Sequence, residues 1–129
     1  MSYFFSKSLD CSFDQGVSKV TEKLKQHGFG VLTEINIQET LKKKIDVDFY
    51  KYKILGACHP HSAFEALSAE DKIGLMLPCN VIVQQKEPDG PVEISGIDPV
   101  ASMASVHNPA LGGLAQKIQS LMKQVIAEL

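Results

Sequence analysis

The stretch NVIVQQKEPDGPVEISGI, residues 80–97, contains the clearest fold signal in this sequence. It places two runs rich in valine and isoleucine on either side of Asp89-Gly90. This dipeptide is typical of a tight hairpin turn, because aspartate and glycine tolerate the backbone conformations that such turns require. The stretch therefore predicts two neighbouring strands joined by a short turn.

The first 28 residues predict a strand followed by a helix. Residues 2–8 alternate weakly between polar and apolar and are expected to form the first strand. Residues 10–28 predict a helix that Asp10 or Ser12 can cap and that His27-Gly28 ends. Its apolar face is expected to consist of Phe13, Val17, Val20 and Leu24.

Residues 29–37 predict a second strand, whose side chains alternate between two faces. One face is expected to carry Phe29, Val31, Ile35 and Ile37, and the other Leu32, Glu34 and Asn36. The next segment, QETLKKKI (residues 38–45), predicts a short and mostly exposed helix.

The middle of the chain predicts a third strand, a helix and further strand structure. In YKYKILGAC (residues 50–58), one face is expected to carry Tyr50, Tyr52, Ile54, Gly56 and Cys58. Pro60 suits the first turn of the following helix, where its missing N–H costs nothing, and this helix is expected to reach about Leu67 or Ala69. Residues 72–79 and 80–87 predict one or two more strands, broken near Pro78.

The C-terminal part predicts a long connection, residues 98–113, with a short helical turn, followed by a long amphipathic helix. Asn108-Pro109 is a strong helix start, because asparagine caps and proline fits the first turn. The apolar stripe of this helix is expected to consist of Leu111, Leu114, Ile118, Leu121, Met122, Val125 and Leu129.

The expected element order is strand, helix, strand, short helix, strand, helix, strand, strand, helix, within a single domain of residues 1–129. Clustered hairpin strands and a long terminal helix favour an α+β fold with two layers. We expect a curved, largely antiparallel sheet of five or six strands, covered on one face by helices.

The composition is that of an ordinary soluble globular protein. The 129 residues are 44% apolar and 22% charged, and the formal charge of −2 gives no basic footprint for nucleic acid. No stretch approaches the roughly 20 apolar residues needed to span a bilayer, and the N-terminus does not read as a signal peptide. Three cysteines without a secretory context predict reduced thiols and a cytoplasmic location.

Two stretches of the sequence, YKILGACHPHSAFEAL (residues 52–67) and IGLMLPCNVIVQQKEPDGPVEI (residues 73–94), resemble the bacterial domain-of-unknown-function family 302. The family pattern is roughly G-x-C-N-P-x-x-A, then G-L-L-L-P-C, an alternating strand and a D-G turn. The matching residues are Gly56, Cys58, Pro60, Ala63, Gly74, Leu75, Leu77, Pro78, Cys79, Val81, Val83, Asp89 and Gly90. His59 departs from the pattern, because the family more often has asparagine there.

The resemblance implies a two-layer α+β fold of the TATA-binding-protein-like, helix-grip type, and a homodimer. It implies no activity, because the family has no established one. Related folds include nucleic-acid binders and proteins with hydrophobic ligand cavities, and the fold alone does not choose between them.

Cys58 and Cys79 form the principal candidate site. Cys58 ends a strand just before a helix, where free N–H groups and the helix dipole favour a thiolate. By alternation Cys58 lies with Ile54 and Tyr52, and Cys79 lies with Val81. If both apolar faces turn toward the helices, the two thiols share one layer.

Three functional interpretations compete for this site. The first is a non-enzymatic module that binds a small ligand or a partner, with a pocket formed by Cys58, Cys79, Tyr52, Met76 and Met103, and with Tyr50 as a further lining candidate. The second is a thiol-based redox or sulfur-transfer protein, with Cys58 as nucleophile and Cys79 as resolving thiol. The third, weaker interpretation is a thiophilic metal bound by Cys58, Cys79 and one of His59 and His61, whose spacing is poor.

The alternative without a function is that both cysteines are small buried residues at tight junctions, since free cysteine is among the most buried residue types.

We take the binding module as the first functional interpretation and the thiol protein as the second. No cofactor and no enzymatic activity are expected. The expected partners are a second copy of the chain and a small molecule, with neither nucleic acid nor membrane.

Overall fold

The computed structural model, which describes residues 2–129, contains the predicted central hairpin. Strands β4 (Cys79–Gln85) and β5 (Val92–Ile97) pair in antiparallel fashion, with Val83 opposite Ile94. Residues 86–91 connect them and include Asp89, whose φ of 62° is left-handed, but Gly90 is not left-handed, so the connection is longer than a tight two-residue turn. The predicted pair of neighbouring strands is therefore confirmed.

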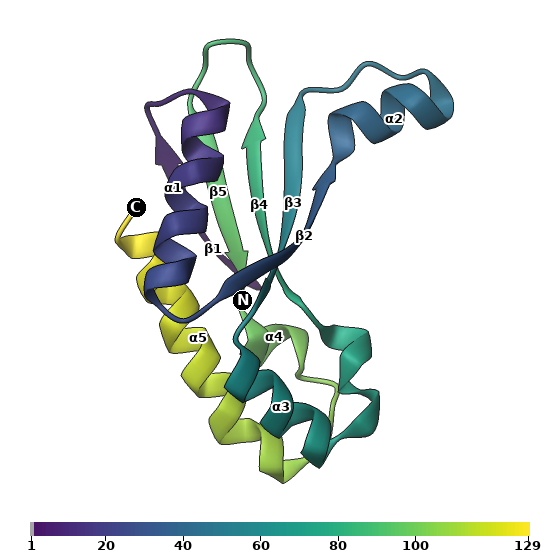
Figure 1. Ribbon diagram of the computed structural model, residues 1–129, viewed down its shortest axis with the longest axis vertical. Helices are drawn as coiled ribbons and strands as arrows, with labels where there is room; N and C mark the ends of the chain where they lie inside the picture. Colours follow the sequence, from purple (N-terminus) through teal and green to yellow (C-terminus); the bar gives the residue numbers. More distant parts are fainter. Residues whose placement is uncertain (1) are drawn as a thin grey trace.

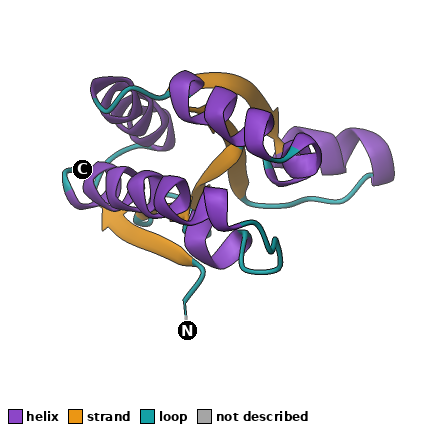
Figure 2. Cartoon of the chain, turned by 90° about the horizontal axis from the view of Figure 1, so that it is seen from below, coloured by secondary structure: helices purple, strands orange, loops and turns teal. Residues whose placement is uncertain are grey.

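A single five-stranded sheet is built around this hairpin. The remaining strands are β1 (Phe4–Leu9), β2 (Gly30–Asn36) and β3 (Lys51–Cys58). The order across the sheet is β1-β5-β4-β3-β2, and every neighbouring pair is antiparallel. In the end-on view the strands form a curved layer beside the helices (Figure 2). The expected α+β class is therefore confirmed, with five strands.

Helices α1 (Phe13–Gln26) and α5 (Gly112–Ala127) cover one face of this sheet (Figure 1). Ser12 caps α1 in a reciprocal capping box with Gln15, as its side-chain chemistry predicts. The core between the helices and the sheet consists mainly of fully buried aliphatic residues: Val20, Leu24, Leu55, Val81, Val83, Val92, Ile94, Met122 and Val125.

A second, smaller core lies beyond the end of the sheet, in the lower part of Figure 1. It is enclosed by α3 (Pro60–Ala69), the 3-10 helix η1 (Asp71–Met76), α4 (Pro99–Ser102), the 3-10 helix η2 (Pro109–Leu111) and the start of α5. Its buried centre is formed by Ala66, Ile73 and Leu111.

The strand structure predicted for residues 72–79 is wrong over most of that stretch. Residues 71–76 form η1 instead, and β4 begins only at Cys79, after Pro78. A short apolar run cannot be assigned to strand or helix by its periodicity alone. Ile73, which is only 1% exposed, anchors η1 in the second core.

The faces predicted for residues 29–37 are also wrong beyond Val31. The pairing of β2 with β3 shifts between Val31 and Thr33, so Leu32 is the extra residue of a β-bulge. One extra residue reverses the alternation, because side chains point to opposite faces with a period of two. Ile35 therefore lies opposite Ile54, on the face that the helices do not cover, and is 45% exposed.

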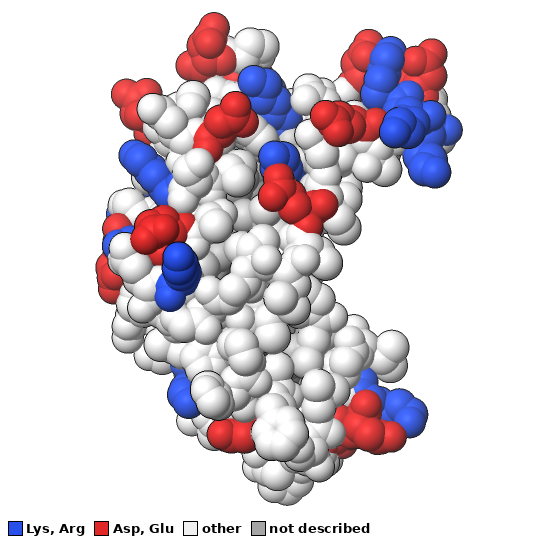
Figure 3. Space-filling view, viewed as in Figure 1, with Lys and Arg blue, Asp and Glu red and all other residues white. Residues whose placement is uncertain are grey.

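Helix α2 (Ile37–Ile45) projects away from the rest of the molecule at the upper right of Figure 1. None of its residues is buried, in agreement with the prediction of a short, mostly exposed helix. Lys42 forms ion pairs with Asp46 and Asp48 at its end. Charged side chains gather on this arm and on the upper part of the molecule, whereas the middle of the same view is nearly uncharged (Figure 3).

No helix in the described part of the chain is long and apolar enough to cross a membrane.

Candidate functional site

A cavity of about 310 Å³ lies where the lower ends of β3 and β4 meet the second core. Its walls come from the β3–α3 junction, from α3, from the Pro78 turn, from the α4 region and from α5. Most of the lining is apolar, with Met103, Leu111, Leu114 and Ile118 on the side of the C-terminal helices. The volume is at the lower end of the roughly 300–1,000 Å³ typical of small-molecule sites.

Small side chains on α3 explain why this space is not filled. The residues of α3 that face the cavity are Ser62, Ala63, Ala66 and Leu67, at a helical spacing of three to four. Three of these four side chains are serine or alanine, so they leave a gap where longer aliphatic side chains would meet α5. The larger Phe64 points elsewhere and is 73% exposed.

The β3–α3 junction, next to the cavity, contains two buried polar side-chain atoms. Strand β3 ends at Cys58, His59 occupies the N-cap position without a side-chain capping bond, and Pro60 begins the helix. Two buried side-chain atoms at this junction have no hydrogen-bond partner within the described residues: Nδ1 of His59 and Oγ of Ser62. Ser62 is only 4% exposed. Both residues line the cavity, but these two atoms are not exposed to it.

His59 is held in a partly buried position by the residues around it. Its ring packs edge-on against Phe29, with 5.5 Å between ring centroids. Burial lowers the pKa of His59, and the positive charges of Lys117 and His61 lower it further. The imidazole is therefore neutral at pH 7, since even its ordinary pKa is about 6.5.

The two candidate cysteines both line the cavity, and all three cysteines of the chain are free thiols. Burial raises the pKa of Cys79 to about 11, with a smaller contribution from Cys58. Cys79 is consequently a neutral thiol near pH 7. Cys58 is less deeply buried than Cys79.

The prediction that the Cys58 and Cys79 thiols share one face of the sheet is wrong. The helix-covered face of β3 carries Leu55 and Ala57, and Cys79 lies opposite Ala57. Cys58 belongs by alternation to the other face, with Ile54. It still contacts the cavity because it is the last residue of β3, where the chain turns into α3.

Of the other predicted pocket residues, Met103 lines the cavity, whereas Tyr52 and Met76 do not. Tyr52 is six residues before Cys58 on an extended strand, which separates them by about 20 Å. Tyr52 and Tyr50 instead pack with Phe49, whose ring centroid is 4.0 Å from that of Tyr50. Met76 ends η1 and borders a separate surface depression.

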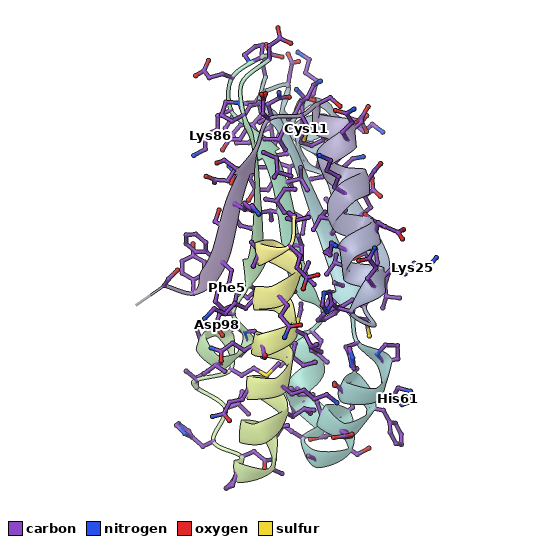
Figure 4. The ribbon with its side chains drawn as sticks, turned by 90° about the vertical axis from the view of Figure 1, so that its left-hand side faces the viewer. Phe5, Cys11, Lys25, His61, Lys86 and Asp98 are labelled. Atoms are coloured by element: carbon purple, nitrogen blue, oxygen red, sulfur yellow. The ribbon has the colours of Figure 1, made fainter. Side chains whose placement is uncertain are left out.

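The residues of the proposed metal set are only partly brought together. Cys58, His59 and Cys79 line the cavity, but His61 is exposed on the outside of α3 and does not line it. Across residues 2–129 no group of three or more His, Cys, Asp or Glu side chains is placed to hold a metal ion. Cys11 lies at the opposite end of the molecule from His61 (Figure 4).

Ser62 is the main site residue that the sequence interpretation missed. Its neighbours on the helix face, Ala63 and Ala66, share its small size, and this run of small residues at helical spacing is the signal that could have indicated a cavity. The cavity that Ser62 lines is completed by α5, which lies about 50 residues later in the chain, so no local pattern could predict it.

Comparisons with known proteins agree with this fold. The family model described as "Domain of unknown function DUF302" matches residues 5–129. The chain is also similar to a solved structure described as "Crystal structure of uncharacterized conserved protein DUF302 from Bacillus stearothermophilus". The two sequences are 25% identical, the similarity covers 98% of each chain, and the TM-score is 0.89. The search of curated proteins found no match.

Proposed function

This chain belongs to the DUF302 family, a family of unknown function, and from that premise we propose that it is a non-enzymatic binding protein for a small, mainly apolar molecule. The ligand occupies the cavity between α3 and α5, next to Cys58 and Cys79. The observation that carries this proposal is the cavity itself, whose lining is almost entirely apolar. Apolar pockets with a few placed polar groups are the usual form of small-molecule sites.

The chemistry of the lining favours binding over catalysis. Cys79 is protonated near pH 7 because burial raises its pKa to about 11, so it does not provide a thiolate nucleophile. The apolar walls supply binding free energy by removing ligand surface from water. We therefore assign these residues to the wall of the pocket.

The proposal is tested with N-phenyl-1-naphthylamine, a neutral apolar dye whose fluorescence rises in apolar surroundings. The wild-type protein is expected to bind it saturably with one site per chain. Ala115→Phe, which puts a ring into the cavity from α5, is expected to weaken binding at least tenfold. Ala127→Phe is the matched control, because Ala127 is an exposed residue of the same helix and should leave binding unchanged.

Circular dichroism establishes that both variants fold. Equal dye binding by wild type and by folded Ala115→Phe would place the dye elsewhere and refute the cavity as the site. Absence of saturable binding to the wild type would refute the proposal for ligands of this class.

A thiol-based redox or sulfur-transfer role is the second candidate, because Cys58 and Cys79 line the same cavity. It would require the two thiols to lose two electrons and two protons to an external oxidant and form a disulfide. Treatment with diamide, followed by mass spectrometry of unreduced peptides, tests this directly. A Cys58–Cys79 disulfide that reductant reverses would support this role over simple binding.

A further inference from the structure

We propose that a second binding site lies at the other end of the molecule, in a depression that takes a small, neutral, hydroxyl-rich molecule of the monosaccharide class. This site is independent of the proposed function, because none of its lining residues lines the apolar cavity. Cys11, which lines the depression, lies at the end of the molecule away from His61 of α3 (Figure 4).

The depression has a volume of about 570 Å³, which is within the usual range of small-molecule sites. Three connections surround it at the upper edge of the sheet in Figure 1: from β1 to α1, from α2 to β3 and from β4 to β5. Unlike the apolar cavity, it is lined by polar and apolar side chains together. Its ligand is therefore expected to form hydrogen bonds.

The first argument for a ligand is a free acceptor on a nearly buried side chain. Gln85, the last residue of β4, is only 8% exposed and lines the depression. Its Nε2 donates a hydrogen bond of 2.9 Å to the carbonyl oxygen of Gly90, which fixes the orientation of the amide. Its Oε1 accepts no hydrogen bond within residues 2–129, and it is not one of the unpartnered atoms there that are sealed from solvent. A ligand donor at this oxygen would satisfy the acceptor.

The second argument is that further acceptors line the same depression. Gln38 donates its Nε2 to the carbonyl oxygen of Phe49 at 3.0 Å, so its Oε1 is the end of the amide left for a ligand. Asp10 and Asp89 add carboxylates, which only accept hydrogen bonds when they are ionised. A molecule with several donors matches this arrangement.

The third argument is the balance of charge, which selects the kind of donor. The charged residues of the lining are Asp10, Lys51, Lys86 and Asp89, two of each sign. Lys51 lies directly opposite Gln85 in the pairing of β3 with β4. A positive charge beside Gln85 disfavours an ammonium donor there, and the two carboxylates disfavour an anion. The neutral donor that remains is the hydroxyl group.

The aromatic part of the lining favours a sugar ring over a flexible polyol. Phe49 and Tyr50 both line the depression, and their rings are stacked with 4.0 Å between centroids. The negative face of an aromatic ring attracts weakly positive C–H groups. A sugar ring carries such C–H groups between its hydroxyls, so it can contact the aromatic rings and the acceptors at the same time.

The test is a titration of ¹⁵N-labelled protein with methyl α-D-glucopyranoside, followed by two-dimensional NMR. The amide signals of residues 49–51 and 85–90 are expected to shift saturably, in the millimolar range expected for so small a ligand. The derivative with all four hydroxyls methylated is expected to bind at least tenfold more weakly, because it has the same ring but no donor. Absence of saturable shifts with the glucoside, or equal binding of both probes, would overturn the inference.

Two charged sugars test the preference for a neutral ligand. Glucosamine and glucuronate are each expected to bind at least about threefold more weakly than the neutral glucoside, because each meets a like charge in the lining. Tighter binding of either one would overturn the neutral ligand class.

Gln85→Leu tests the acceptor, and it is expected to weaken binding of the glucoside about fivefold. Gln84→Leu is the matched control, because Gln84 is also 8% exposed but does not line the depression. Unchanged binding by a folded Gln85→Leu would overturn the role of Gln85. If circular dichroism shows that Gln85→Leu does not fold, the methylated probe decides, because it removes the same hydrogen bonds from the ligand side.

The dye of the apolar cavity separates the two sites. The glucoside is expected to leave bound N-phenyl-1-naphthylamine in place, because the depression and the cavity share no residue. Displacement of the dye would place the sugar in the cavity and overturn the second site, whereas failure of the dye to bind would affect the proposed function alone.

Discussion

Burial determines the chemistry of Cys79, whose side chain lies between β4 and the cavity. Its pKa is raised from 9.0 to about 11, chiefly because burial disfavours the thiolate. At pH 8 a rise of two units lowers the thiolate fraction about a hundredfold. Since the thiolate is the species that reacts with alkylating agents, Cys79 should be nearly inert in the folded protein.

We therefore predict that iodoacetamide at pH 8 modifies Cys79 at least a hundredfold more slowly in the native protein than in guanidinium chloride. Peptide mass spectrometry measures the rate separately for Cys11, Cys58 and Cys79. The native rate at Cys79 should keep rising between about pH 9 and pH 11, whereas the rate in the unfolded chain levels off above pH 9. Equal native and unfolded rates at pH 8 would show that Cys79 is accessible and ionisable, and would favour the thiol-redox candidate.

At the scale of elements, the junction of β2, β3 and the Pro78 turn depends on a glycine. A Cβ added to Gly56 would collide with the hydroxyl of Thr33 and would lie 2.8 Å from Cγ of Pro78. Thr33 could change its rotamer, but the proline ring cannot move without the backbone. Gly56 is thus required by the close approach of two neighbouring segments to β3.

Gly56→Ala is expected to lower the free energy of unfolding by about 1–3 kcal/mol, which is the usual cost of overpacking. Gly30→Ala is the matched control, because Gly30 is a strand glycine in β2 with nothing within 4 Å of the added Cβ. It should be neutral or slightly stabilising. Urea denaturation of both variants measures the difference, and equal stabilities would mean that the Pro78 turn moves freely.

Elements whose signal is local could be predicted from the sequence. Ser12 acts through hydrogen bonds within a few residues, so its cap is present as predicted, and Asp89-Gly90 lies in the connection of the predicted hairpin. The bulge at Leu32 could not be predicted, because it depends on the pairing with β3 rather than on the composition of β2. Residues 71–76 were ambiguous for a related reason, since burial of Ile73 decides their conformation.

At the scale of the whole molecule, the fold followed from local sequence signals, whereas the site depends on contacts between distant segments. The alternation and the D-G turn predicted the curved antiparallel sheet with helices on one face. The positions of Cys58 and Cys79 indicated the β3–α3 junction and the Pro78 turn as a candidate site, and both cysteines line one cavity there. Ser62 escaped prediction because the cavity that it lines forms only between segments that are distant in the sequence, α3 and α5.

The arrangement of α2 gives an independent reason to expect self-association. This nine-residue helix has no buried residue within the described chain, and Ile45 and Val47 at its end are 64% and 41% exposed. Helices shorter than about 12–15 residues are marginal in water without tertiary contacts. Leu32 and Ile35 are also exposed, on β2, which is an edge strand of the sheet. We propose that a second copy of the chain covers this apolar surface of α2 and β2.

The prediction is a dimer with twice the 14.1 kDa mass of the chain, observed by sedimentation velocity at about 10 µM, a concentration well above the dissociation constant of a stable interface. Ile45→Asp is expected to shift the equilibrium toward monomer, because it places a charge in an apolar interface. Thr40→Asp, an exposed change on the same helix, should leave the dimer intact. A monomeric wild type at 100 µM would contradict the prediction, and a dimer unaffected by Ile45→Asp would move the interface away from α2.

Because Leu32 also lines the cavity, a dimer through β2 would narrow the cavity entrance, so dilution to monomer should speed the release of bound dye.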